Sequence, residues 1–123
     1  MSKRSDFSED SDFRLAVQDI YESLADQLEE ILEQLEESKT IEADFFEPQL
    51  AAGSLSVVFE DGAVFMLSQQ TPTHEIWLSA NYTAWHFLYE SGQWIERDTG
   101  VVMIDILAQL LSEKIGAKVQ LQL

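Results

Sequence analysis

The sequence contains no cysteine and few basic residues, and both shortages exclude whole classes of function. Without cysteine the chain can form no disulfide, no thiolate metal site and no thiol nucleophile. Its seven lysines and arginines stand against 23 aspartates and glutamates, which gives a formal net charge of −16. A field of this sign repels phosphate backbones and attracts cations or basic protein surfaces, so we expect no binding to nucleic acid.

Long apolar runs and catalytic motifs are also missing. No apolar segment approaches the ~20 residues that span a bilayer, and the acid-rich start lacks the apolar core of a secretory signal. We therefore expect a cytoplasmic protein that does not insert into a membrane. There is no glycine-rich phosphate loop and no nucleophile elbow, and no pair of carboxylates stands out as an acid–base couple. These absences predict a protein that is not an enzyme.

The apolar content of the chain is sufficient for one folded domain. Of the 123 residues, 46% are hydrophobic and 11% are aromatic, which favours a packed globule over a disordered chain. Within residues 1–11 only Phe7 is a candidate for burial. We therefore expect a flexible acidic tail over residues 1–11 and a single domain over residues 12–123.

The apolar residues between positions 12 and 38 recur at steps of three and four, which predicts one long amphipathic helix. The helix begins at Ser11 or Asp12, either of which can cap it, and runs to about Ser38 without glycine or proline. Acidic residues follow the side opposite to the apolar face. They are Asp19, Glu22, Asp26, Glu29, Glu30, Glu33, Glu36 and Glu37.

Beyond residue 40 the apolar pattern changes to the alternation that is typical of strands. Strands are expected over residues 40–47, 55–59, 63–68, 74–80, 84–90 and 93–97, with an interruption over residues 48–53. Helical spacing returns over residues 102–115, and Gly116 ends this second helix. Residues 118–123 are either an edge strand or a segment laid over the core.

This order of elements predicts an α+β fold. We expect a two-layer sandwich in which the N- and C-terminal helices pack on one face of an antiparallel sheet of about six strands. The other sheet face stays open and is a natural docking surface. Trp77 lies between Ile76 and Leu78 in a predicted strand, so apolar side chains occupy both faces of that strand. Trp77 is then either a core residue or an aromatic anchor for a partner.

The acidic helix face allows two interpretations. Its carboxylate oxygens suit hard cations such as iron, and Glu42 and Asp44 on the predicted first strand extend it. Alternatively, a solvated acidic face maintains solubility or meets a basic partner, and the helix pattern alone favours this second interpretation. Like charges in this spacing destabilise a helix, most of all near its C-terminal end. We call the following residues the acidic ridge: Asp26, Glu29, Glu30, Glu33, Glu36, Glu37, Glu42 and Asp44.

Nothing in the sequence forms a closed metal cage. There is no EF-hand loop and no helical histidine pair, so we expect any metal to be bound weakly through exposed carboxylates. His74 and His86 are the only histidines, and single histidines on strands are more often packing or surface residues than ligands. An iron-oxidising enzyme would need Glu-x-x-His pairs on facing helices, and the chain has none.

Residues 68–78, Ser-Gln-Gln-Thr-Pro-Thr-His-Glu-Ile-Trp-Leu, resemble the signature of the frataxin family in its bacterial form. That signature reads Asn-Arg/Lys-Gln-x-Pro-x-x-Gln-x-Trp-Leu. The strand and turn at residues 55–62 and the turn at residues 98–100 are similar to the family as well. The chain departs from the signature at Ser68, Gln69 and Glu75, which affects the expected contacts of the sheet face and not the fold.

The resemblance implies an iron-binding accessory protein of iron–sulfur cluster assembly that contacts the cysteine desulfurase and the scaffold protein. It implies weak binding of Fe²⁺ or Fe³⁺, with other divalent cations also accepted, and a monomer when no metal is bound. By position, the implied iron-associated residues are Glu29, Glu30, Glu33, Glu36, Glu42 and Asp44, to which the helix face adds Asp26 and Glu37. The implied partner contacts are Gln70 and Trp77 on the sheet, and Glu30 and Glu33 on the acidic ridge. The alternative is an acidic interaction module that works without metal.

Overall fold

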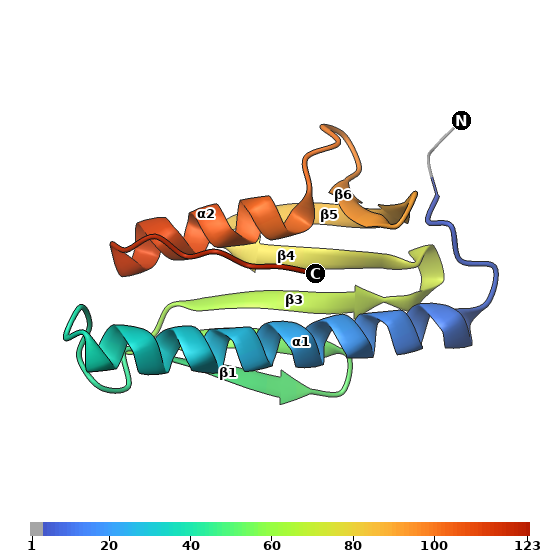
Figure 1. Cartoon of the computed structure of the whole chain (residues 1–123). Coiled ribbons are helices and arrows are strands. Elements are labelled where there is room, and N and C mark those ends of the chain that lie inside the picture. Colours follow the sequence, from blue (N-terminus) through green and yellow to red (C-terminus); the bar gives the residue numbers. More distant parts are fainter. Residues whose placement is uncertain (1–3) are drawn as a thin grey trace.

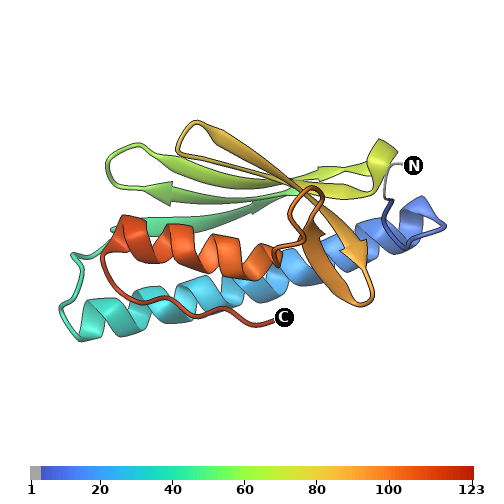
Figure 2. The same cartoon turned by 90° about the horizontal axis from the view of Figure 1, so that it is seen from above.

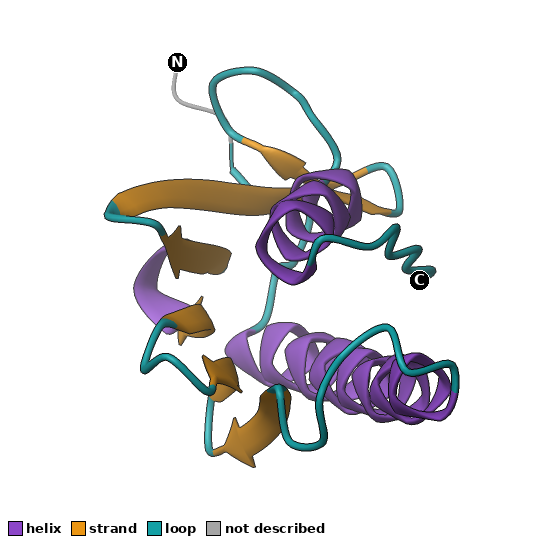
Figure 3. Cartoon of the chain, turned by 90° about the vertical axis from the view of Figure 1, so that its left-hand side faces the viewer, coloured by secondary structure: helices purple, strands orange, loops and turns teal. Residues whose placement is uncertain are grey.

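The computed structural model describes residues 4–123, which form a six-stranded antiparallel sheet and two helices (Figure 1). The elements are α1 (Asp10–Glu37), β1 (Phe46–Ala51), β2 (Ser54–Phe59), β3 (Val64–Gln70), the 3-10 helix η1 (Thr71–Thr73), β4 (Glu75–Ala80), β5 (Thr83–Glu90), β6 (Gln93–Glu96) and α2 (Met103–Ile115). Both α-helices lie on the same side of the sheet (Figure 3). The predicted two-layer α+β sandwich is therefore confirmed. Over the described residues, no helix is long and apolar enough to cross a membrane.

The strands follow one another across the sheet in chain order, because tight turns join each to the next. Between β2 and β3, the side chain of Asp61 accepts a hydrogen bond from the N–H of Ala63 at 2.9 Å, and Gly62 has a φ of 91°. Between β4 and β5, Asn81 and Tyr82 both have positive φ, 51° and 62°. Two successive residues of this kind suit a type I′ hairpin turn, whose twist matches that of the strands.

Both helices occur where their apolar spacing predicts them, but α1 begins at Asp10, before the predicted caps Ser11 and Asp12, and its N-cap Glu9 makes no side-chain hydrogen bond. Their buried faces meet the inner face of the sheet, where alternate residues of the strands are buried as well. Gly116 ends α2 in the left-handed conformation, with a φ of 79°. The buried helix residues are Phe13, Val17, Tyr21, Leu24, Ala25 and Leu28 in α1, and Met103, Leu107, Leu111 and Ile115 in α2.

The last turns of α1 are less deeply buried than the rest. Leu28 is the final fully buried residue of the helix, and the apolar residues beyond it are only partly covered. No basic residue lies in the last turn. The end of α1 that carries most of the acidic ridge is therefore held to the core by fewer apolar contacts than the beginning.

The predicted strand over residues 40–47 is wrong for residues 40–45, and only Phe46 and Glu47 belong to a strand. After Glu37 the backbone turns back on the helix, and the N–H of Lys39 donates to the carbonyl of Glu36 at 3.0 Å. Lys39 and Asp44 both have a φ of 59°, a left-handed conformation that an extended strand excludes. This segment is therefore a loop, and most of it is exposed.

The first strand begins at Phe46 and continues through Pro48, within the stretch that we expected to interrupt the sheet. Pro48 pairs with Val57 of β2. Proline lacks an N–H and is tolerated on a strand whose free side is not paired. Because β1 is an edge strand of the sheet, Pro48 does not break it.

The C-terminal residues form a segment laid over the core, as one of the two alternatives predicted, and not a strand. The segment returns from α2 towards α1 (Figure 2). Val119 and Leu121 are only 5% and 8% exposed. The side-chain amide of Gln27 on α1 donates to the carbonyl of Gln122 at 2.6 Å and accepts from its N–H at 2.9 Å.

The first described residues contact the sheet. The N–H of Asp6 donates to the carbonyl of Tyr89 at 2.9 Å, and the ring of Phe7 stacks on that of Tyr89 with centroids 4.8 Å apart. Mobility of the tail over residues 1–11 stays a prediction, and residues 1–3 lie outside the described residues.

Leu121→Ala should lower the free energy of unfolding by about 2–3 kcal/mol, because it removes a buried side chain that joins the C-terminal segment to the core. Gln120→Ala, at an exposed neighbouring position, should change it by less than about 0.5 kcal/mol. Urea denaturation of both variants checks this. Equal losses would mean that the segment does not contribute through Leu121.

Candidate functional site

The acidic ridge lies on the solvent side of α1 and in the loop that follows. Every member of the ridge is exposed except Glu36, which is partly buried. The carboxylate of Glu36 accepts a hydrogen bond from the backbone N–H of Asp44 at 3.0 Å. Glu42 and Asp44 therefore approach the helix through a loop and not along the face of a strand.

The charges of the acidic ridge are not neutralised within the described part of the chain. The ion pairs found there involve other acids: Asp10, Asp61 and Glu75. The ridge carboxylates thus repel one another and attract cations from solution.

The described residues contain no group of three histidines or acids close enough together to enclose a metal ion. The carboxylate oxygens of the ridge have the chemistry that hard cations prefer. The geometry therefore fits loose binding, in which one or two exposed carboxylates contact an ion that keeps most of its water.

The open face of the sheet presents Trp77, which is 38% exposed, whereas its neighbours Ile76 and Leu78 are completely buried on the other face. The register pairs Trp77 with Ser68 of β3 and His86 of β5. One face of β4 therefore presents an aromatic side chain to solvent. The other predicted contact of this face, Gln70 at the end of β3, is half-buried.

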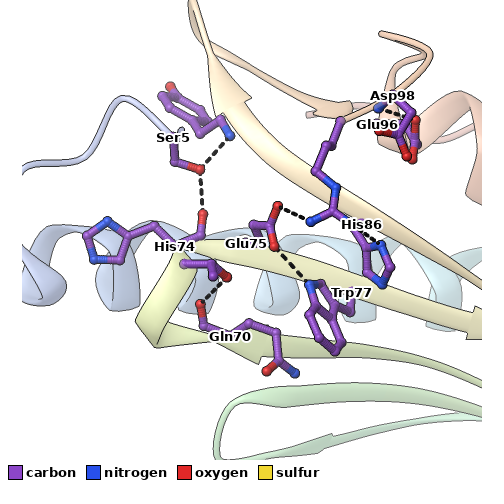
Figure 4. A network of polar contacts seen from close by, with 11 residues as sticks. Ser5, Gln70, His74, Glu75, Trp77, His86, Glu96 and Asp98 are labelled. Atoms are coloured by element: carbon purple, nitrogen blue, oxygen red, sulfur yellow. Dashed lines mark hydrogen bonds and ion pairs between the residues drawn. The ribbon is translucent and has the colours of Figure 1, made fainter. Parts of the chain in front are cut away.

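A polar network surrounds Trp77, and Glu75 is at its centre (Figure 4). Glu75 is only 4% exposed. Its carboxylate accepts a hydrogen bond from the indole N–H of Trp77 at 3.1 Å and forms an ion pair with Arg97 at 3.5 Å. The guanidinium of Arg97 also donates to Nδ1 of His86 at 3.0 Å. Glu75 therefore holds an aromatic ring and a cation side by side on the open face.

The sequence does not reveal this network. Glu75 stands out there only as a departure from the frataxin signature, in place of glutamine, and Arg97 has no expected role. One signal was available: Arg97 is one of only three basic residues after position 47. A lone cation among acids needs a partner, but the sequence does not show which acid the fold brings to it.

The backbone at Arg97 is fixed by the buried carboxylate of Glu96 in the turn after β6. This carboxylate accepts hydrogen bonds from the N–H groups of Asp98 and Thr99, both at 2.7 Å, and from the Thr99 hydroxyl at 3.1 Å. Burial raises the pKa of Glu96, but these hydrogen bonds outweigh burial and hold the pKa below its usual range. The turn is thus stabilised by a charged acceptor.

His74 is a packing residue in this structure. Its Nε2 lies 2.6 Å from a carboxylate oxygen of Asp10, and its ring stacks on Phe13 with centroids 4.9 Å apart. The carbonyl of His74 accepts from the hydroxyl of Ser5, which connects the start of the chain to the end of η1 (Figure 4).

Comparison with known proteins identifies the family. The family model for the frataxin-like domain matches residues 6–117. The iron-sulfur cluster assembly protein CyaY of Azotobacter vinelandii is 32% identical over 102 residues, which are 81% of this chain and 90% of that protein. The chain belongs to the frataxin family, CyaY type. CyaY of Pseudomonas fluorescens is also 32% identical, over 99 residues, with 79% of this chain and 87% of that protein covered.

Solved frataxin structures share the fold. Frataxin from Psychromonas ingrahamii superposes with a TM-score of 0.70 at 22% identity, covering 91% of this chain and 96% of that one. Trimeric frataxin from Saccharomyces cerevisiae, complexed with ferrous iron, gives a TM-score of 0.55 at 24% identity, covering 74% of this chain and 83% of that one. At these sequence identities the structural similarity establishes the fold and not the functional site.

Glu96→Gln should lower the free energy of unfolding at pH 7 by about 1–2 kcal/mol, because a neutral amide replaces a charged acceptor of three hydrogen bonds. Since the pKa of Glu96 is lower in the folded than in the unfolded state, its stabilisation is present above the usual glutamate value of about 4.3 and is lost as the pH falls through the folded value. The difference between wild type and variant should therefore be smaller at pH 3 than at pH 7 in urea denaturation. Glu60→Gln, at an exposed position, should show little difference at either pH. An equal loss of unfolding free energy at both pH values would contradict the inference that the charged form of Glu96 stabilises the turn.

Proposed function

We propose that the protein is an accessory factor of iron–sulfur cluster assembly, which binds iron weakly on the acidic ridge and docks on the cysteine desulfurase and its scaffold protein. The observation that carries the proposal is the unneutralised acidic ridge on α1, in a chain whose CyaY relatives are named for this process. The proposal describes a cytoplasmic adaptor that is monomeric without metal and is not an enzyme.

The iron part of the proposal is supported by the chemistry of the ridge. Hard cations prefer carboxylate oxygens, and no ion pair with a basic residue in the described chain competes for those of the ridge. The related yeast frataxin is described as complexed with ferrous iron. Iron is here a cargo that concentrates along the helix, and other divalent cations compete for the same oxygens.

The docking part is supported by two surfaces of different character. The acidic ridge suits a basic patch on a partner, and we propose that this partner is the desulfurase. On this chain, Glu30 and Glu33 would make the contacts. The open sheet face, with Trp77 and Gln70, suits the second partner, because exposed aromatic residues are frequent anchors of interfaces. Since metal and a basic partner use the same carboxylates, loading with metal should weaken docking by the ridge, and docking should weaken metal binding equally.

One observation favours a second candidate function. Because the described residues bring no three metal-binding side chains together, the acidic ridge could serve protein docking alone, with incidental metal binding. In that case metal-free protein would bind and restrain the desulfurase fully, and added Fe²⁺ would change nothing.

Anaerobic Fe²⁺ titration of the ¹⁵N-labelled protein should broaden the amide signals of residues 26–44 selectively and leave Trp77 unaffected. Bound paramagnetic iron relaxes only nearby nuclei, and the ridge is on the opposite side of the molecule from the open face. Diamagnetic Mg²⁺ should shift the same signals without broadening them. Uniform or absent changes would refute the assignment of the ridge as the iron site.

Glu29→Lys combined with Glu33→Lys should abolish capture of the desulfurase in a pull-down, because two repulsive charges replace two attractive ones. Glu60→Lys combined with Glu113→Lys changes the net charge equally at exposed positions outside the ridge and should retain binding. Equal loss in both double variants would show that net charge, and not the ridge, drives the interaction.

A further inference from the structure

We propose that Arg97, beside Trp77 on the open face, is a binding subsite for a carboxylate that a partner presents next to an apolar group. The proposal deepens, and rests on, the proposed docking of the open face, because it states the chemistry of what docks there. The acidic ridge suits a basic partner surface, whereas this subsite suits an acidic one.

The first observation is the character of the face around Trp77. Paired positions on β2 to β5 carry small or apolar side chains there: Ser56, Val64, Met66, Ser68, Ser79 and Ala84. Val64 and Met66 are 45% and 37% exposed. In a chain with a net charge of −16, an uncharged area of this kind is where an acidic partner segment meets least repulsion.

The second observation is the unused hydrogen-bonding capacity of Arg97. A guanidinium carries five N–H donors in a planar fork that matches a carboxylate. The structure uses two side-chain contacts, one to Glu75 and one to His86, and the side chain remains 42% exposed. Arginine commonly contacts more than one acceptor, so its remaining donors are available to a second carboxylate.

The third observation is the burial of Glu75. A buried ion pair adds little net stability compared with well-packed apolar residues, so stability alone does not account for it. Its carboxylate orients both the Trp77 indole and the Arg97 guanidinium. Fixing both groups before binding reduces the entropy that a partner's docking must overcome.

His86 completes the subsite. Arg97 can only donate, so Nδ1 of His86 accepts, and the neutral ring then carries its proton on Nε2. The ring is partly exposed and lies edge-on to Trp77, with centroids 4.5 Å apart. Arg97 and His86 thus supply donors, and Trp77 supplies an apolar surface, all within one small area.

The probe that tests this is 3-phenylpropionate, with 3-phenylpropionamide as its uncharged match. Both are titrated into the ¹⁵N-labelled protein while the Trp77 indole and Arg97 Nε signals are followed. We expect saturable shifts at both signals, and a dissociation constant for the acid lower than that for the amide by about threefold or more, the size of one partly exposed ion pair. Equal affinities for acid and amide would overturn the proposal.

Arg97→Gln should remove the preference for the acid, whereas Lys118→Gln, which alters the net charge equally at an exposed distant site, should keep it. Arg97→Lys keeps the charge but loses the fork, and should reduce the preference without abolishing it. A preference that persists in Arg97→Gln would overturn the subsite. The amide spectrum of each variant shows whether it folds. These titrations involve neither iron nor desulfurase, so their failure would leave the role of the acidic ridge standing, and failure of the ridge experiments would leave the subsite standing.

Discussion

The packing of α1 against the sheet is the constraint on which the rest of the structure depends. Buried residues from Phe13 to Leu28 fix the rotation of the helix, and this rotation sends the acidic side chains to solvent. Because both helices lie on one side, the same packing leaves the opposite sheet face open (Figure 3). The molecule therefore has two working surfaces that are separated by its core. One surface is acidic and exposed, and the other carries small and apolar side chains together with the polar network of Glu75.

These surfaces differ in how they are supported. The acidic ridge extends past the last fully buried residue of α1, where like charges and the helix dipole are both unfavourable. Such a region gains most from a cation or a basic partner, because either one relieves repulsion already present. On the open face, by contrast, the carboxylate of Glu75 binds the Trp77 indole and the Arg97 guanidinium. A partner therefore meets side chains that are already held in place.

The sequence predicted most of the fold because its local signals agree. Helical spacing identified both helices, and alternation bounded by turn residues identified β2 to β6. The first strand is misplaced from the sequence because proline usually interrupts a strand, although an edge strand tolerates Pro48, and because the left-handed residues Lys39 and Asp44 have no reliable local signature. The acidic face of α1 is periodic and was predictable. The pairing of Glu75 with Arg97 was not, because it joins residues on separate strands whose register only the folded sheet fixes.

The chain order of the strands has a consequence for how the protein folds. A short connection joins each strand to the next, so pairing neighbouring strands costs little loop-closure entropy. The contacts made by α1, by the residues before it, by α2 and by the C-terminal segment join distant parts of the chain, among them the ion pair of Lys114 with Asp61. Joining the two ends of the chain to the sheet therefore carries the largest loop-closure cost of assembly. Without the sheet, the buried face of the acidic helix has no surface to pack against.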